Sequence, residues 1–425
     1  MSILVICFIG FIIIGLPIAF VICASSAVYL AATDASPLIL IVQKAVSGMD
    51  SFPLLAIPLF ILMGYIMEAV GLSERLIRWT QIFFGRVTGG LGMIAIISSA
   101  IFAALTGSGP ATVAAIGTIM LPVMMKNGYP KGSAAGIIAA SGSLGPIIPP
   151  STVMIIYATT VGVSISELFM AGVIPGIMIA LMFCIVNYIY AKRVWHLPKD
   201  SRQYTGKEVV MLTIQALPTL LLPIIILGGI YGGVFTPTEA GAVGTVYSLI
   251  LGFVYRKLTI KVLADVVKRS MEASAMAGFL IGMSSIFCWI IAAESIPSKI
   301  VGAISPILNG NLAVFWILFL VILLLAGCVL EALSAVIILA PILVPIGLEM
   351  GIDPLHLALV FCVTMVIGVI TPPFGGVLFT TVSVTKTPFM DVVKGELPYI
   401  ITMVAAVILI VLFPGLATWL PGIMA

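Results

Sequence analysis

Charged residues are scarce in this chain of 425 residues: Asp, Glu, Lys and Arg make up 8% of it, whereas hydrophobic residues make up 62%. Soluble domains carry roughly 25% charged residues, so the composition excludes an ordinary soluble protein. Apolar runs of about 18 residues or more, long enough to cross the hydrocarbon of a bilayer, recur from one end to the other. The sequence therefore predicts an all-α polytopic membrane protein in contact with the lipid bilayer.

Metal ligands and catalytic motifs are also few. The two histidines, His196 and His356, stand alone in polar loops, and the six cysteines lie inside apolar runs without CxxC spacing. This pattern argues against a metal cluster, a disulfide framework and a histidine proton relay. The motifs HExxH, GxSxG and GxxxxGK[ST] are absent as well, which argues against an intramembrane enzyme and against nucleotide binding by this chain.

Helix-breaking residues, in contrast, recur at a constant distance. Superposing the two halves without a gap, at an offset of 223 residues, aligns three groups of them: Pro122 with Pro345, Gly145 with Gly368, and Pro149-Pro150 with Pro372-Pro373. Membrane helices avoid such residues unless something needs them. The chain is therefore interpreted as an internal duplication with one broken helix in each half.

Basic residues gather in four regions, which the positive-inside rule places in the cytoplasm: 75–86, 126–131, 192–207 and 256–269. These loops account for the net charge of +3, so no nucleic-acid partner is expected. Acidic connections belong outside. Both conditions are met if residues 89–126 and 312–350 form helical hairpins, the first opening to the cytoplasm and the second to the periplasm, so that the two halves are inverted.

The predicted organisation has five parts. Residues 1–88 form the first scaffold, with one long N-terminal span that is retained rather than cleaved and an arm helix at 72–88. Residues 89–191 form the first hairpin and broken helix. Residues 192–311 form a cytoplasmic loop, the second scaffold and an arm helix at 295–311. Residues 312–396 form the second hairpin and broken helix, ending in a loop at 388–396, and 397–425 form a C-terminal span.

A helix broken inside a membrane leaves backbone groups unpaired, at a cost of several kcal/mol each if nothing fills them. Unwound carbonyls suit Na⁺, and the helix N-termini after each break offer amides to an anion. Paired broken helices are the sequence indication of a transporter with its site near the midplane. We therefore predict one cation site between "TGSGPAT" and "LGPIIPPS", a second between "GCVLEALSA" and "GVITPPFGG", and an anionic substrate between them.

Single glycines and prolines in membrane helices are usually explained by packing and kinks, and only their duplication favours binding. Glu331 is a carboxylate at membrane depth, which is functional by default, and the alternative is an interfacial anchor. We expect it to hold the second hairpin tip through backbone amides or a cation. The segment "TPTE" predicts a structural capping box, with Thr236 as the N-cap and Glu239 at the third helical position.

At these motifs the chain resembles the large membrane subunit of a tripartite ATP-independent periplasmic (TRAP) transporter. The resemblance covers essentially the whole chain and is carried by "GSGPATVAAIG", "GSLGPIIPPS", "FTPTEAGAV" and "IGVITPPFGGVLF". It implies an elevator-type, Na⁺-driven transporter of a bacterial or archaeal inner membrane, which takes an organic acid from a periplasmic binding protein. It also implies a four-span small membrane subunit as a partner.

The resemblance implies particular site residues as well. The first Na⁺ would lie between a hairpin tip and a break: Thr106, Ser108 and Gly109 on one side, Ser143, Gly145 and Pro149 on the other. A second Na⁺ would lie among Gly327, Gly368 and Thr371. The substrate would contact Ser108, Ser151 and Glu331. Two positions depart from the family pattern, since many members carry Asp where Glu331 stands and a small polar residue where Pro110 stands.

Other classes fit less well. An ATP-driven permease subunit would need a partner with a nucleotide motif and has no need of broken-helix repeats. A divalent-anion or dicarboxylate Na⁺ symporter that works without a binding protein would share the same fold, so it stays the closest alternative. Uptake into vesicles with and without soluble binding protein separates the two.

Overall fold

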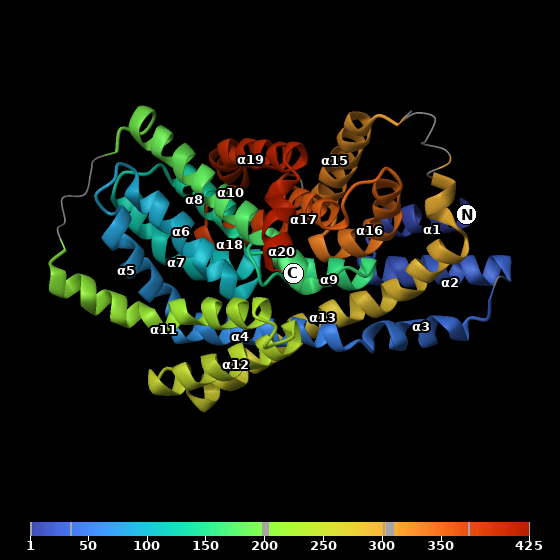
Figure 1. Ribbon diagram of the computed structural model, residues 1–425, viewed down its shortest axis with the longest axis horizontal. Helices are drawn as coiled ribbons and strands as arrows, with labels where there is room; N and C mark the ends of the chain where they lie inside the picture. Colours follow the sequence, from blue (N-terminus) through green and yellow to red (C-terminus); the bar gives the residue numbers. More distant parts are fainter. Residues whose placement is uncertain are drawn as a thin grey trace.

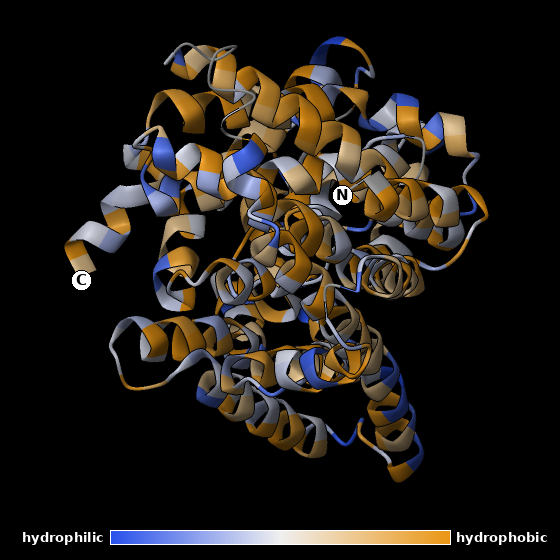
Figure 2. Ribbon diagram, turned by 90° about the vertical axis from the view of Figure 1, so that its right-hand side faces the viewer, coloured by the Kyte–Doolittle hydropathy of each residue, from blue (hydrophilic) through white to orange (hydrophobic). Residues whose placement is uncertain are grey.

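The computed structural model describes residues 2–34, 36–197, 204–300, 302, 310–372 and 375–424. Within these residues every regular element is helical and no strand occurs. Eight of the described helices are long and apolar enough to cross a membrane. Figure 2 shows hydrophobic residues along most of the helices and hydrophilic residues in short patches. The predicted all-α polytopic fold is confirmed.

The first scaffold contains five α-helices and one short 3₁₀ helix: α1 (Ser2–Ile13), α2 (Ile18–Thr33), α3 (Ile39–Met49), η1 (Phe52–Leu55), α4 (Ala56–Val70) and α5 (Leu72–Phe84). The single N-terminal span predicted from the sequence is wrong. Gly15, at a φ of +85°, and Pro17 end α1 and start α2 as a separate helix, because neither residue continues a helix well. The helix α5 lies where the first arm helix is predicted.

The first hairpin and the first broken helix follow: α6 (Gly90–Thr106), α7 (Gly109–Lys126), α8 (Lys131–Gly142), α9 (Thr152–Val161) and α10 (Ile165–Arg193). The second scaffold contains α11 (Gly206–Tyr231), α12 (Pro237–Val254) and α13 (Ile260–Ala293). In the predicted second arm helix, 295–311, residues 296–300 and 302 are helical, whereas 301 and 303–309 lie outside the described residues. Thr236 and Glu239 form the predicted capping box at the start of α12. The backbone and hydroxyl hydrogen bonds from Thr236 lower the pKa of Glu239.

The second hairpin and second broken helix are α15 (Leu312–Val329), α16 (Ala332–Glu349), α17 (Pro354–Ile370) and α18 (Gly376–Thr385), followed by α19 (Phe389–Leu412) and α20 (Gly415–Met424). The loop predicted at 388–396 is wrong, because α19 begins at Phe389 and includes nearly all of this segment. The predicted C-terminal span is accordingly the later part of α19 together with α20.

The duplication is visible in the helix boundaries. Adding the offset that separates Pro122 from Pro345 to the bounds of α7 gives the bounds of α16. The same offset takes the start of α8 to the start of α17, which continues further, and brings the bounds of α9 within one residue of those of α18. In the scaffold α2 and α12 correspond approximately, whereas α11 is longer than α1 and begins earlier in its repeat. One difference is that α3 and α4 are separate, whereas the corresponding α13 is continuous, because Ser51 and Pro53 interrupt the first copy.

Figure 1 shows two layers. The scaffold helices α2, α3, α4, α11, α12 and α13 form one layer, and the hairpins and broken helices lie above it. The first hairpin, α6 and α7, reaches the centre from the left of this view, and the second, α15 and α16, reaches it from the right. The layers therefore meet where both hairpin tips converge.

Candidate functional site

The first hairpin tip, Gly107 and Ser108, packs against the first break, residues 143–151. Gly107 has a φ of +58°, which a glycine adopts without strain and which turns the chain from α6 into α7. A Cβ at Gly145 would lie 2.8 Å from both the Ser108 carbonyl oxygen and the Gly109 amide nitrogen, so only a glycine allows this approach. The structure thus brings together the tip and the break that the sequence pairs.

An oxygen cluster lies inside this tip. The hydroxyls of Thr106 and Thr112 are 3.2 Å apart, and Thr112 Oγ1 donates to the Ser108 carbonyl at 2.8 Å. Thr106 Oγ1 lies 3.5 Å from the same carbonyl. Hydroxyl and carbonyl oxygens are the donors that a hard cation takes, so these residues fit Na⁺. Thr112 is absent from the predicted ligands, and its position four residues after Ser108 is the signal that could have identified it.

The prolines of the first break leave carbonyl groups without their helical partners. Pro146 and Pro149 have no N–H, so the carbonyls four residues earlier, at Gly142 and Gly145, cannot form helical hydrogen bonds to them. The Gly142 carbonyl accepts from the Gly145 amide at 3.0 Å, and the Pro146 carbonyl accepts from Ser151 Oγ at 2.6 Å. The Gly145 carbonyl, which packs against the first tip, is therefore one backbone oxygen of the break that could accept a cation.

Two predicted serines turn away from the space between the tips. Ser151 caps α9 by accepting a hydrogen bond from the Met154 amide at 3.3 Å, and Ser143 Oγ donates to the Ala140 carbonyl at 2.6 Å. Ser143 Oγ also lies 3.4 Å from the sulfur of Met403 in α19. Both serine side chains are fully buried. Their roles in Na⁺ and substrate binding stay predictions.

The second tip lies within its predicted segment, Gly327–Ala335. The turn between α15 and α16 is made by Leu330 and Glu331, whereas Gly327 belongs to the last turn of α15. Gly327 instead allows close packing against α17, because a Cβ there would lie 2.8 Å from the Cα of Gly368. Thr371 lies one helical turn after Gly368, and its amide donates to the Gly368 carbonyl at 2.9 Å. The three predicted residues of the second site are therefore neighbours, but Pro373 of the second break lies outside the described residues.

A cavity of about 470 Å³ lies where the two tips meet the scaffold. Its volume is within the range of small-ligand pockets, which is roughly 300–1,000 Å³. Helices α2, α4 and α13 form its scaffold side. The hairpins and broken helices contribute Thr106, Ser108, Pro146, Thr152, Glu331 and Val369, among others. Both tips and both broken helices therefore border one space, as the repeat predicts.

Glu331 faces this cavity as the N-cap residue of α16. Its side chain is exposed and forms no capping hydrogen bond, so the expected hold on the backbone amides of the tip is wrong. The negative charge still lies at a helix N-terminus, where the macrodipole favours it. Its interaction with a cation and its contact with the substrate stay predictions.

The fold and the site together define a class: a multi-pass membrane transporter, not an enzyme, with paired hairpins and broken helices around a central cavity. A family model described as "Tripartite ATP-independent periplasmic transporter, DctM component" matches residues 5–416. The chain therefore belongs to this family, the large membrane subunits of TRAP transporters.

Individual relatives agree with this assignment. The chain is 40% identical to the C4-dicarboxylate TRAP transporter large permease protein DctM of Pseudomonas aeruginosa, over 88% of this chain and 87% of the relative. It is 36% identical to the 2,3-diketo-L-gulonate TRAP transporter large permease protein YiaN of Escherichia coli, over 96% of each. It is 37% identical, over 97% of its own length, to the isethionate TRAP transporter permease protein DctMQ of Oleidesulfovibrio alaskensis, but spans only 65% of that protein.

A solved structure supports the fold alone. The YdaH transporter of Alcanivorax borkumensis superposes with a TM-score of 0.63, covering 97% of this chain and 98% of the other, at 15% sequence identity.

Proposed function

We propose that this chain is the permease of a Na⁺-coupled secondary transporter in the inner membrane, which takes up an organic acid delivered by a periplasmic binding protein. The observation that carries the proposal is that both hairpin tips, both broken helices and the scaffold border one shared cavity. Relatives named for C4-dicarboxylates, 2,3-diketo-L-gulonate and sialic acid indicate a carboxylate substrate. The partners would be the binding protein and a four-span small membrane subunit.

Two or more Na⁺ ions would be held at the tip–break contacts. The first site would use the oxygens of Thr106, Ser108 and Thr112 with the Gly145 carbonyl, and the second would use Gly368 and Thr371. Because hydroxyl and carbonyl oxygens are neutral, a bound cation would leave net positive charge near the cavity and would favour an anionic substrate there. Binding of Na⁺ and of the acid would thus support each other.

The proposed movement is an elevator: the hairpins and broken helices slide as one unit along the scaffold. The layered arrangement supports this division, because the cavity lies on the boundary between the two layers. Spin labels at Ile214 of α11 and Ile401 of α19, which are 63% and 61% exposed, would report it. On a cysteine-free background, their distance distribution should change when Na⁺ and the transported acid are added. A pair at Ile214 and Ile250, both in the scaffold, should not change.

The deciding experiment is uptake into proteoliposomes that contain this chain, its small subunit and the binding protein. An imposed inward Na⁺ gradient should drive accumulation of the acid, whereas K⁺ with internal ATP should not. Equal uptake under the two conditions would refute Na⁺ coupling. Uptake that is just as fast without the binding protein would instead favour the alternative, a dicarboxylate Na⁺ symporter.

A further inference from the structure

The cavity lacks a positive charge of its own. Among its described lining residues none is Lys, Arg or His, and the charged side chain that lines it is Glu331. A carboxylate substrate would thus leave water and meet a negative group without a protein cation beside it. Two negative groups close together at low dielectric repel each other strongly. Arg269, on the lining helix α13, carries a positive charge that would offset this repulsion.

Arg269 does not line this cavity but lies one helical turn beyond its lining. It precedes the lining residue Ala273 by one turn of α13, and its guanidinium carbon lies 4.6 Å from the ring centre of Tyr65, another lining residue, on α4. The side chain of Arg269 is 44% exposed. It is therefore partly exposed and packs against the ring of a residue that lines the cavity.

The partner of Arg269 is Glu68, and their ion pair is loose. Arg269 Nη2 lies 3.7 Å from Glu68 Oε1, longer than the roughly 2.7–2.9 Å of a charge-assisted hydrogen bond. The other carboxylate oxygen of Glu68 is buried and has no hydrogen-bond partner among the described residues. Since a guanidinium carries five N–H donors, Arg269 retains donors for a second carboxylate.

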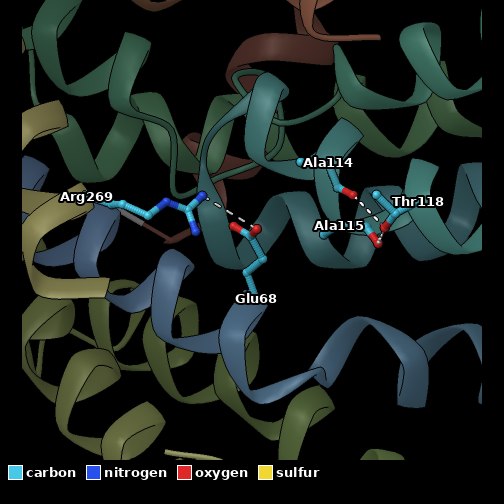
Figure 3. A network of polar contacts seen from close by, with 5 residues as sticks. All are labelled: Glu68, Ala114, Ala115, Thr118 and Arg269. Carbon is cyan, nitrogen blue, oxygen red and sulfur yellow. Dashed lines mark hydrogen bonds and ion pairs between the residues drawn. The ribbon is translucent and has the colours of Figure 1, made fainter. Parts of the chain in front are cut away.

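Figure 3 shows Glu68 and Arg269 pointing toward each other from α4 and α13, next to Ala114, Ala115 and Thr118 of α7. Thr118 Oγ1 donates to the Ala114 carbonyl at 2.9 Å, within its own helix, and α7 contains no acidic residue that could compete for the arginine. The ion pair therefore lies on the boundary between the scaffold and the first hairpin, beside the helix whose first turn lines the cavity.

We propose that Arg269 binds a carboxylate of the transported acid next to the cavity, and that Glu68 occupies the guanidinium when the acid is absent. The proposal rests on the proposed function, because it assumes an organic-acid substrate. Exchange of one carboxylate for another would keep the Arg269 guanidinium paired in both states, whereas Glu68 would lose its partner when the acid binds. Glu68 would thus compete with the substrate for the Arg269 guanidinium. In the protein without substrate, it would stabilise the guanidinium by pairing with it.

The test is the thermal stability of the purified chain with its small subunit, titrated with the sodium salts of succinate, 2,3-diketo-L-gulonate and sialic acid at constant Na⁺. At least one acid should stabilise the wild type. Arg269→Gln should raise the half-saturating concentration of that acid about tenfold, because a charge-assisted contact is lost. Glu68→Gln should lower it, because the competitor is gone. A purely structural ion pair would instead make both variants shift it in the same direction.

A matched control is the exposed pair of Lys268 and Glu272 on the same helix, which lie 4.0 Å apart with side chains 76% and 64% exposed. Lys268→Gln and Glu272→Gln make the same charge changes away from the cavity and should leave acid binding unchanged. Wild-type affinity in Arg269→Gln, or a wild type that none of the acids stabilises, would overturn the proposal. Na⁺-driven uptake by the wild type, measured separately, shows whether the proposed function stands in that case.

Discussion

Ser108 and Glu331 occupy the same position in the two repeats. Each is the N-cap residue of the second helix of its hairpin, neither side chain forms a capping hydrogen bond, and both line the central cavity. An N-cap side chain normally satisfies a free amide of the first helical turn. Because these two do not, their oxygens and the neighbouring amides remain available to ions and to substrate.

Replacement of Glu331 should separate the effect of its charge from that of its shape. We expect Glu331→Ala to lose most transport, about tenfold or more, because the carboxylate that can hold a cation at the second tip is gone. Glu331→Gln keeps the shape and an amide oxygen, so it should retain part of the rate. The measurement is the initial rate of Na⁺-driven uptake in proteoliposomes. Full activity of the alanine variant would show that Glu331 is not needed for transport and would favour the alternative, an interfacial anchor.

Removal of single hydroxyls should weaken Na⁺ dependence only in part. Ser108→Ala and Thr371→Ala each delete one oxygen from a site otherwise built on backbone carbonyls, so the Na⁺ concentration for half-maximal uptake should rise about threefold to tenfold. Thr112→Ala should resemble Ser108→Ala, since its hydroxyl donates to the Ser108 carbonyl at 2.8 Å. Wild-type Na⁺ dependence in all three variants would place the ions elsewhere.

The backbone of the first break should be more sensitive than the hydroxyls. Gly145→Ala would place a methyl group 2.8 Å from the Ser108 carbonyl oxygen. The atoms that this methyl group would meet belong to the backbone of Ser108 and Gly109, which cannot move aside as a flexible side chain can. We expect a larger loss of Na⁺-driven uptake than in Ser108→Ala. The matched control is Gly278→Ala in α13, where a Cβ meets no atom within 4 Å. If both alanine variants transported equally well, the close tip–break contact would not matter.

The sequence predicts the fold well because its strongest signals are local. Gly and Pro in apolar surroundings mark hairpins and breaks, and the bounds of α7 and α16 agree with the predicted repeat. The sequence places the second tip correctly but does not reveal the use of Gly327, which packs against Gly368 while the turn itself uses Leu330 and Glu331. Whether a glycine makes a turn or a close helix contact depends on residues far away in the sequence.

The same limit explains why Glu396 is missed. Its surroundings in sequence, with Asp391 and Lys394 nearby, are typical of a polar loop, yet the structure includes it in α19 and buries it fully. The cause is a close contact between α8 and α19, in which the glycines Gly136 and Gly395 bring the two backbones together. Such a contact depends on two segments more than two hundred residues apart, so no local pattern reveals it.

Glu396 gives the last prediction. Both of its carboxylate oxygens are buried without a hydrogen-bond partner among the described residues, which costs the folded protein about 1–3 kcal/mol or more. We therefore expect Glu396→Leu to raise the thermal unfolding temperature of the purified protein, and Glu396→Gln to change it less, because an amide remains unpartnered. Glu349→Leu, at an exposed position near the end of α16, serves as the control and should give no gain. If Glu396→Leu instead abolished transport while the protein stayed folded, the carboxyl group would take part in the cycle through an ion or a proton. A loss of stability alone would indicate that leucine does not fit the tight contact between α8 and α19.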